Sequence, residues 1–340
     1  MKKVQLPFST GIKNNSLYIE EELIMYRIGV DLGGTNIVAG VVNENNQIIA
    51  KGQRKTNVPR PAEQIFDDIA AAIDDAMKAA GITKNDVQSI GVGTPGSVNK
   101  AEGLIEFANN LGFDNTPALR LLTERTGIGR IYFDNDANCA ALGEAVAGCG
   151  KGVKNFVAIT LGTGVGSGII VNGKLVTGCN YAAGEMGHTV IVYNGEQCNC
   201  GRRGCWERYS SATALIAQTK DAMRKHYESK MWQLVDNDIA KVNGRTAFDG
   251  MRMGDAAATA VVDNYVALLA CGVGNIINIF QPDVLCIGGG VGNEGENLLT
   301  PLRKVVNSEI YSIHAKKQTQ ILPAELGNDA GIIGAALLDE

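Results

Sequence analysis

Residues 27–51, RIGVDLGGTNIVAGVVNENNQIIAK, read as a strand, a Gly-Gly-Thr-Asn turn, a second strand, an Asn-rich turn and a third strand. Residues 156–177, FVAITLGTGVGSGIIVNGKLVT, repeat this order, with a glycine turn at 161–168 and a second turn at Asn172 and Gly173. Two copies of one strand–turn–strand–turn–strand unit indicate an internal duplication. The sequence therefore predicts two similar lobes that face each other.

Helices and buried strands alternate after each unit, which is typical of the α/β class. Residues 218–250 are charged and poor in apolar residues, and we expect helical surface there, with a loop at Asn243 and Gly244. Asp255 is the expected N-cap of a long Ala-rich helix. The expected helices are 62–80, 116–126, 139–147 and 255–279, and the expected buried strands are 89–93, 129–134 and 284–288.

Size and charge limit the classes of function. The chain has 340 residues, 45% of them hydrophobic, which favours two domains. A formal net charge of −5, without a long Lys/Arg run, argues against nucleic acid and against an anionic membrane as partners. No apolar run approaches the roughly 18 residues that a membrane span needs, and the N-terminus lacks the apolar core of a signal peptide. We therefore expect a cytoplasmic protein that acts on a small molecule.

Residues 1–24 are polar and lack periodicity. They are expected to be a disordered extension or a start-site artefact. The Glu20, Glu21 and Glu22 codons would be purine-rich, like a ribosome-binding site just before Met25. We hypothesise that Met25 is the natural start.

The glycine turns are candidate phosphate sites, because backbone amides without side chains can approach phosphate oxygens. The alternatives are ordinary hairpins for the first two turns and close helix packing for the turn at 288–292. Gly168 and Lys174 have P-loop spacing, but Leu175 replaces the required Ser/Thr and a strand follows. A carboxylate at Asp31 would hold the Mg²⁺ that accompanies ATP. The expected nucleotide-binding residues are Asp31, Gly33, Gly34, Thr35, Asn36, Thr163, Gly164, Gly289 and Gly290.

Three of the eight cysteines crowd into residues 198–205, at Cys198, Cys200 and Cys205, with His188 ten residues upstream. Three thiolates and one imidazole suit tetrahedral Zn²⁺, and four protein ligands make the metal structural. A catalytic zinc or a redox thiol pair is the alternative. The scattered cysteines indicate buried thiols in a reducing compartment.

Asp136 follows a buried strand and opens an Ala-rich helix, where a carboxylate would face a cleft. Phosphoryl transfer needs a base for the attacking hydroxyl, so Asp136 is the candidate catalytic residue, with a helix cap as the alternative. Polar groups that converge could cradle a polyhydroxylated sugar, although each could also be solvated surface. These groups are Asn110, Glu185, His188 and Glu207.

Taken together, these motifs resemble the ROK family of repressors, open reading frames and sugar kinases, most closely its bacterial glucokinases. The resemblance runs from about Met25 to the C-terminus. In place of an aromatic residue after the sugar-loop asparagine, this chain has Asn110-Leu-Gly-Phe113, which alters the pocket. The motifs are Asp31–Asn36, Gly93–Gly96, Asn135–Asn138, Leu161–Gly168, Gly184–His188, Cys198–Glu207 and Gly288–Gly290.

The resemblance implies a two-lobed actin/hexokinase-like (ribonuclease H-like) fold, with duplicated β-β-β-α-β-α-β-α lobes around a cleft. The small lobe would be 25–135 plus 328–340, closed by a helix at 329–338, and the large lobe would be 136–327 with a zinc loop at 188–205. It implies Asp136 as base for the hydroxyl on carbon 6 and zinc on the His188 and cysteine set. The implied sugar contacts are Gly96, Asn110, Asn135, Asp136, Glu185, His188 and Glu207.

The implied activity is ATP- and Mg²⁺-dependent phosphorylation of a hexose, most of all glucose. Fructose, allose or N-acetylmannosamine are alternative substrates, and a non-catalytic sugar-sensing regulator is an alternative of another class. Residues 1–24 are too short and acidic for a DNA-binding winged helix. A homodimer or homotetramer is expected.

Overall fold

The computed structural model describes residues 3–4, 19–20 and 25–338. In the N-terminal segment it describes only two short antiparallel strands, β1 (Lys3–Val4) and β2 (Ile19–Glu20). The expectations for residues 1–24 otherwise lie outside the described residues.

Two five-stranded sheets have the same strand order. In the first sheet, β3 pairs antiparallel with β4 and parallel with β6, and in the second, β11 pairs in the same two ways with β12 and β14. This correspondence confirms the duplicated α/β architecture. In spatial order the first sheet is β5 (Ile48–Lys55), β4 (Asn36–Val42), β3 (Tyr26–Leu32), β6 (Val87–Thr94) and β10 (Ile131–Asn135), and the second is β13 (Lys174–Leu175), β12 (Val165–Val171), β11 (Phe156–Leu161), β14 (Val284–Gly288) and β15 (Gln320–Pro323).

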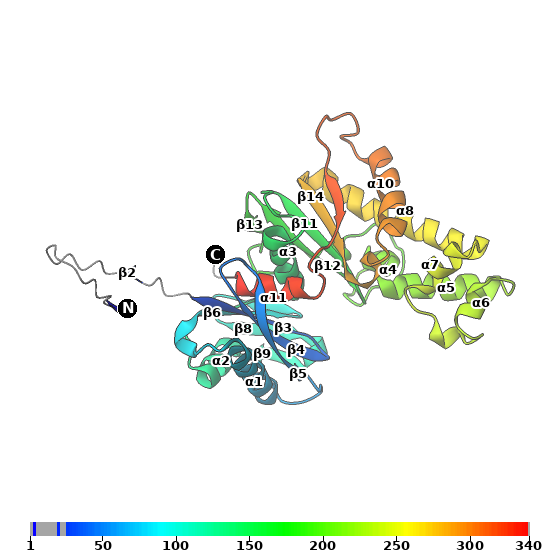
Figure 1. Ribbon diagram of the computed structural model, residues 1–340. Helices are drawn as coiled ribbons and strands as arrows, with labels where there is room; N and C mark the ends of the chain where they lie inside the picture. The colour runs from blue at the N-terminus through cyan, green and yellow to red at the C-terminus, as the bar shows by residue number, and fades with distance from the viewer. Residues whose placement is uncertain (1–2, 5–18, 21–24, 339–340) are drawn as a thin grey trace, which may run out of the picture.

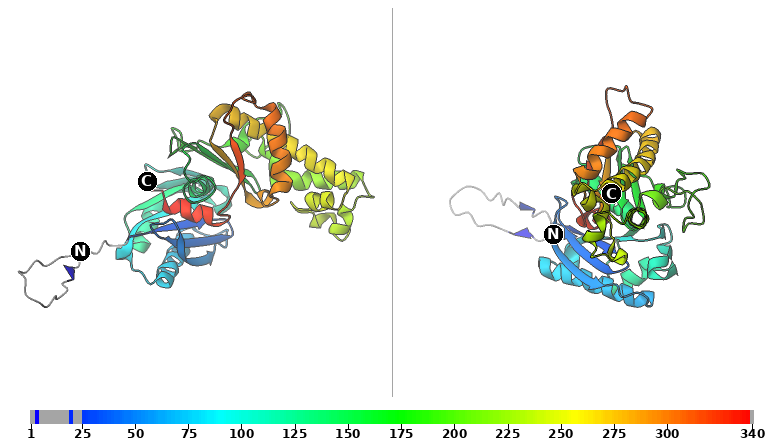
Figure 2. Two further views of the ribbon diagram at one scale, coloured as in Figure 1. Left: turned by 45° about the horizontal axis from the view of Figure 1, so that its top comes forward. Right: turned by 90° about the vertical axis from the view of Figure 1, so that its right-hand side faces the viewer.

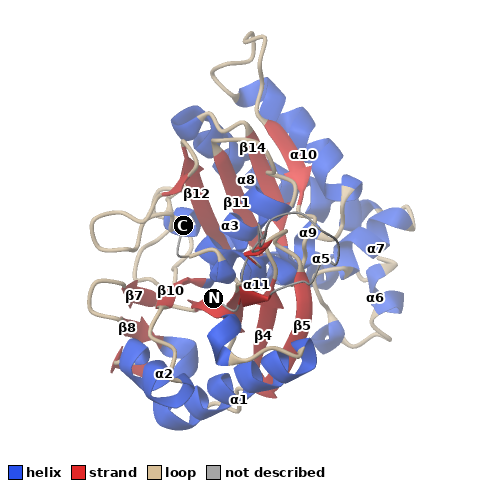
Figure 3. Ribbon diagram, turned by 60° about the vertical axis from the view of Figure 1, so that its left-hand side comes forward, coloured by secondary structure: helices blue, strands red, loops and turns tan. Residues whose placement is uncertain are grey.

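Each sheet has its own apolar core. Helix α1 (Ala62–Ala80) buries one apolar stripe against β4 and β5, and Gly81 ends it in the left-handed conformation. Figure 3 shows α1 along the outer edge of the first sheet, with α8 and α10 beside the second. The other helices of these layers are α2 (Ala118–Thr126), α3 (Asp136–Ala147), α8 (Ala256–Phe280), α9 (Gly289–Gly292), α10 (Glu296–Glu309) and α11 (Asp329–Ala336).

Helices α3 and α11 lie between the two sheets (Figure 1). The two helices approach so closely that a Cβ on Gly334 of α11 would lie 1.7 Å from the carbonyl oxygen of Cys139 in α3. Only glycine fits at this contact. Helix α11 also packs on β3 and β6, while α3 packs on β11 and β12. The chain therefore returns to the first sheet through α11, where the family resemblance implies a helix at 329–338 and the structure has one that ends at Ala336.

A small three-stranded sheet projects from the first half toward the cleft side. It consists of β7 (Ser97–Asn99), β8 (Leu104–Ala108) and β9 (Phe113–Thr116), and the 3₁₀ turn η2 (Asn109–Leu111) joins β8 to β9. Contacts between β7 and β10 attach this sheet to the first large sheet.

Residues 212–252 form a helical extension on the second half, which projects away from the first half in Figure 2. The sequence predicts only surface there, and this was wrong in one respect. A small apolar cluster is buried there against Ala258 of α8, and it consists of Met223, Met231, Val235 and Val242. These residues are spread along the chain and meet only in three dimensions, so no sequence pattern revealed them. The elements are α5 (Ala212–Lys225), α6 (Met231–Leu234), η4 (Ile239–Lys241) and α7 (Thr246–Arg252), with the expected loop at 243–244.

Helix α8 begins as predicted, since Asp255 accepts a hydrogen bond from the N–H of Ala258 at 2.7 Å. Among the described residues it is long and apolar enough to cross a membrane, which the sequence analysis did not anticipate. However, 61% of its most apolar stretch is buried inside the protein, where it forms the centre of the second core.

Several predicted boundaries differ, including the start of helix α3 and the end of strand β13. Helix α3 begins at Asp136, three residues before the predicted start, because the Asn135 side chain accepts the N–H of Ala137 and caps the helix. Strand β13 ends at Leu175, two residues before the predicted end. The first change places Asp136 within the first turn of a helix.

Candidate functional site

A cleft of about 750 Å³ opens between elements of the two halves. Its walls come from the ends of β3, β6, β10, β11, β12 and β14 and from the loops that follow them. Ligands of open α/β sheets commonly bind beyond such strand ends. The cleft is therefore the candidate active site.

All seven predicted sugar-contacting residues line this cleft. Gly96 follows β6 and Asn110 lies in η2, whereas Glu185, His188 and Glu207 come from the segment after β13, in or beside η3 (Met186–His188) and at the start of α4 (Glu207–Ser210). Polar side chains up to 97 positions apart, Asn110 and Glu207, thus line the same cleft, which spacing alone could not establish. The seven are Gly96, Asn110, Asn135, Asp136, Glu185, His188 and Glu207.

Asp136 is the first residue of α3, and one of its oxygens accepts the N–H of Ala137 at 2.8 Å. Water in the open cleft reaches its carboxylate, but the cleft walls surround it. This burial raises the pKa of Asp136 above its ordinary value, while the bond from Ala137 lowers it in part. A carboxylate with a raised pKa is a stronger proton acceptor, as a general base requires.

Asn135 uses its side chain within the protein. Its oxygen caps α3 by accepting the N–H of Ala137 at 2.9 Å, and its nitrogen donates to the carbonyl of Gly96 at 3.2 Å. The Asn135 side chain therefore connects the turn at Asp136 to the turn at Gly96 by hydrogen bonds.

Glu207 and Glu185 are held by strand β12. The Glu207 carboxylate accepts the N–H of Val165 at 2.9 Å. This contact needs a glycine beside it, because a Cβ on Gly164 would lie 2.3 Å from the same carboxylate oxygen. Ser167 donates a short hydrogen bond to the carbonyl of Gly184 and accepts the N–H of Met186 at 3.2 Å, which fixes the backbone on both sides of Glu185.

The glycine turns differ in position. Asp31, Gly164, Gly289 and Gly290 line the cleft as expected. The other expected nucleotide-binding residues are not among its lining residues, although Thr163 neighbours Gly164; these are Gly33, Gly34, Thr35, Asn36 and Thr163.

The first turn is instead bound to the strand behind it. Thr56 donates to the Gly33 carbonyl at 2.6 Å, and Lys55 donates to the Asn36 side chain at 2.7 Å.

Asp31 is the next-to-last residue of β3, lies beside α11 and lines the cleft together with Asp136. Burial and the negative charge of Asp136 raise the pKa of Asp31 from 3.8 to about 6. A divalent metal bound by Asp31 would offset both the burial of its charge and the repulsion from Asp136.

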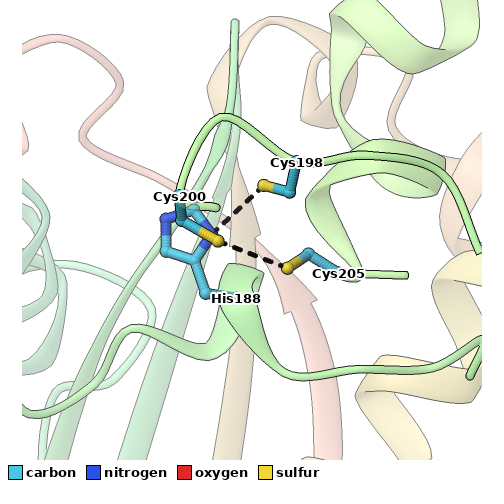
Figure 4. Close-up of side chains that lie close together, drawn as sticks. All are labelled: His188, Cys198, Cys200 and Cys205. Atoms are coloured by element: carbon cyan, nitrogen blue, oxygen red, sulfur yellow. Dashed lines mark hydrogen bonds between the residues drawn. The ribbon is translucent and has the colours of Figure 1, made fainter. Parts of the chain in front are cut away.

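Next to the cleft wall that holds Glu185 and Glu207, His188, Cys198, Cys200 and Cys205 turn toward one point (Figure 4). Their ligand atoms all lie within 4.8 Å of one another. The Cys200 and Cys205 sulfurs are 3.6 Å apart, and the Cys198 sulfur is 3.7 Å from Nδ1 of His188. Tetrahedral zinc with bonds of about 2.3 Å to sulfur requires ligand separations of about 3.8 Å, so the set fits such an ion.

The loop that holds this set is anchored to the second core. Trp206 follows Cys205, is fully buried and donates its indole N–H to the carbonyl of Leu268 in α8 at 3.2 Å. Gly201 and Gly204 both have positive φ, in agreement with the predicted tight turn.

A second group with metal-ligand chemistry lies at the inner end of the cleft, formed by Glu144, Cys149 and Cys286. The Glu144 carboxylate already accepts three backbone N–H groups, from Cys149 at 3.2 Å, Glu325 at 3.1 Å and Leu326 at 2.7 Å. It therefore fastens the loop before α11 to α3.

The sequence analysis missed several cleft residues. Asn293 follows the third glycine turn, and Gly327 and Asn328 precede α11. Gly-Asn directly before a helix that opens with Asp is a turn signal that could have drawn attention to them. The missed residues with polar or glycine character include Glu144, Ser167, Asn293, Gly327, Asn328 and Gly331.

Comparison with known proteins agrees with this geometry. The sequence model of the ROK family matches residues 27–340. A glucokinase from Thermotoga maritima is 37% identical over 310 residues, which cover 91% of this chain and 95% of that protein. A xylose repressor from Caldicellulosiruptor bescii is 30% identical over 286 residues, 84% of this chain and 70% of that protein.

Among solved structures, a ROK family glucokinase from Streptomyces griseus in complex with glucose and AMPPNP superposes with a TM-score of 0.78. It is 35% identical and covers 92% of this chain and 98% of its own. This chain therefore belongs to the ROK family.

Proposed function

We propose that the protein is an ATP-dependent glucokinase, which transfers the γ-phosphoryl group of ATP to the hydroxyl on carbon 6 of glucose. The observation that carries this proposal is one cleft whose walls hold two kinds of group. The carboxylates of Asp136, Glu185 and Glu207 suit the hydroxyls of a sugar, and the glycines at 289 and 290 suit phosphates. The relative from Streptomyces griseus was solved with glucose and an ATP analogue.

In this proposal Asp136 accepts the proton of the attacking hydroxyl. Its raised pKa favours this role, and the capped start of α3 holds the carboxylate at one place. Asn110, Glu185, His188 and Glu207 would bind the remaining hydroxyls, since carboxylates and amides together accept and donate as a sugar requires.

The glycine turns at 162–166 and 288–290 would receive the phosphates through backbone N–H groups. The first turn, Gly33–Asn36, would reach ATP only when the lobes close. Asp31 would hold Mg²⁺, which supplies positive charge for the developing negative charge of phosphoryl transfer. Closure would also exclude water and so limit hydrolysis of ATP without sugar.

Zinc on His188, Cys198, Cys200 and Cys205 would be structural, because four protein ligands leave no open position. With Nδ1 toward the thiols, His188 would have its other ring nitrogen available for sugar, while the metal fixes the ring. The proposed lobes are 25–135 plus 328–340 and 136–327, in a cytoplasmic homodimer or homotetramer.

The test is ADP release with ATP and Mg²⁺ on a panel of sugars. The panel comprises glucose, fructose, mannose, allose, N-acetylglucosamine and N-acetylmannosamine. We expect turnover on glucose, and a loss of roughly 10³–10⁴-fold in kcat for Asp136→Asn with glucose binding retained in calorimetry. The surface variant Asp221→Asn, on α5, is the matched control.

Preference for another sugar would overturn glucose as the substrate but keep the kinase. Sugar binding without turnover on any sugar would overturn the kinase and support a sugar-sensing regulator, as in the repressor relative.

A further inference from the structure

A buried ion pair lies directly behind the proposed base. The Lys100 ammonium contacts the Asp134 carboxylate, whose side chain is 1% exposed, while that of Lys100 is 31% exposed. Asp134 is the next-to-last residue of β10, two residues before Asp136, and Lys100 lies in the turn between β7 and β8. A carboxylate this buried needs a cation and hydrogen bonds to remain ionised.

The two oxygens of Asp134 hold different parts of the site. One accepts the bond from Lys100, and the other accepts the N–H of Asn135 at 2.7 Å and the side-chain amide of Asn138 at 2.9 Å. Asn135 and Asn138 flank Asp136 at the start of α3. Asp134 therefore joins the turn that carries Asp136 to the β7–β8 hairpin.

That hairpin lies between two of the expected sugar contacts. It begins just after Gly96 and leads through β8 to Asn110, and both of these residues line the cleft. The pair thus connects the expected sugar contacts of the first half with the expected base, without lining the cleft itself.

Charges of both signs act together beside the base. Asp31 on β3, Asp134 on β10 and Asp136 on α3 all act on the buried thiol of Cys139, and the positive charge of Lys100 opposes them. Their combined effect and, above all, burial keep that thiol neutral, with a pKa well above its ordinary value. Across the cleft the ionisable lining residues are Glu185, His188 and Glu207.

We propose that Lys100 is a positioning residue for phosphoryl transfer, which acts through Asp134 to hold the Asp136 turn against the β7–β8 hairpin and to offset the negative charge beside Asp136. This inference rests on the proposed function, in which Asp136 is the base. It assigns a role to a residue outside the cleft and outside every motif in the sequence.

The test is the pH profile of kcat/KM for glucose in the full-length, zinc-loaded protein. Lys100→Met leaves two carboxylates without their cation, so we expect the acid limb to move up by about one pH unit and kcat to fall roughly 10–100-fold. Asp134→Asn removes the neighbouring negative charge, so the limb should move down. Lys100→Arg should restore the wild-type profile.

The double variant Lys100→Met/Asp134→Asn removes both charges and should return the limb near that of the wild type, with a smaller loss than the sum of the single losses. The matched control is Lys317→Met, which removes a lysine that pairs with Asp283 and is 82% exposed, and should change neither quantity. Opposite shifts from the two single variants would support an electrostatic role, since loss of structure alone cannot reverse sign.

An active wild type whose acid limb stays fixed in both single variants, or moves in the same direction in both, overturns this inference. If Lys100→Met does not fold, the downward shift in Asp134→Asn still decides it. A wild type without turnover on any hexose overturns the proposed function instead, and the two failures are thereby distinguished.

Discussion

The two five-stranded sheets share one strand order, but their glycine turns serve different surroundings. The second turn lies on the cleft wall at Gly164, where it allows Glu207 to reach the N–H of Val165. The first turn lies off the wall, tied to the next strand by Thr56 and Lys55. Duplication therefore provides the scaffold and not the site.

What makes the site is added between the repeated elements. The first half adds the hairpin sheet β7–β9, with Asn110 at its tip. The second half adds the Cys/His loop between β13 and α4, with Glu185 and His188. The two additions meet across the cleft because α3 and α11 hold the sheets together at glycine contacts.

The largest effect expected is from loss of the proposed zinc site, which His188 and three cysteines of the second half form. In Cys198→Ser, or after chelation, we expect the 184–210 loop to unfold and kcat/KM for glucose to fall at least on the order of 100-fold. Hydrogen exchange should increase in that loop and stay unchanged in the first sheet. The control is Cys179→Ser, since Cys179 is exposed and outside the metal set. Equal exchange in both halves would contradict this asymmetry.

A second prediction concerns Gly164→Ala. The new Cβ would collide with the Glu207 carboxylate at 2.3 Å and displace it, and we expect a roughly 100-fold loss in kcat/KM with the zinc content unchanged. Steady-state kinetics and metal analysis check this. Gly129→Ala is the control, because nothing lies within 4 Å of its Cβ position. A fully active Gly164→Ala enzyme would show that Glu207 does not need its bond to β12.

Asp31 permits a prediction on stability. Its pKa of about 6 in the folded protein exceeds the ordinary 3.8, so between about pH 4 and pH 6 unfolding releases a proton and the free energy of unfolding falls as pH rises. Ionisation of Asp31 in the folded protein thus lowers the free energy of unfolding by up to about 3 kcal/mol, and the full loss is reached above about pH 6. Asp31→Asn should remove it, raise the Tm at neutral pH and weaken Mg²⁺-dependent turnover roughly 10-fold.

Thermal unfolding at about pH 5 and about pH 7.5 distinguishes the two proteins. The wild type should lose stability relative to the variant at the higher pH, and added Mg²⁺ should reduce that difference. A constant difference at both pH values would show that Asp31 carries no such penalty.

The smallest effect is expected in the first turn. Gly34→Ala should fit without a clash, because the nearest atom to its Cβ position is 3.8 Å away, in Asn110. The Tm should not change. We expect the KM for ATP to rise about 5-fold, because closure of the lobes would bring this turn to the nucleotide. An unchanged KM would mean that only the second turn contacts ATP.

The sequence by itself determined the duplicated α/β fold, most element positions and the metal set, because these follow from short-range patterns. Strand alternation and glycine turns recur in the two halves, and Cys198, Cys200 and Cys205 are close enough in sequence to share an ion with His188. Helix α3 alone began earlier than expected, at Asp136, because Asn135 rather than Asp136 supplies the cap.

Only the tertiary structure decided which polar groups meet. Asn110 and Glu207 line one cleft because the two sheets face each other, and Lys100 reaches Asp134 because β7 packs beside β10. It also decided that Gly33–Asn36 lies off the cleft wall, although its sequence resembles that of the second turn in composition. Hydrogen bonds and ion pairs between distant segments depend on packing and leave no periodic signal in the chain, so sequence patterns could not reveal them.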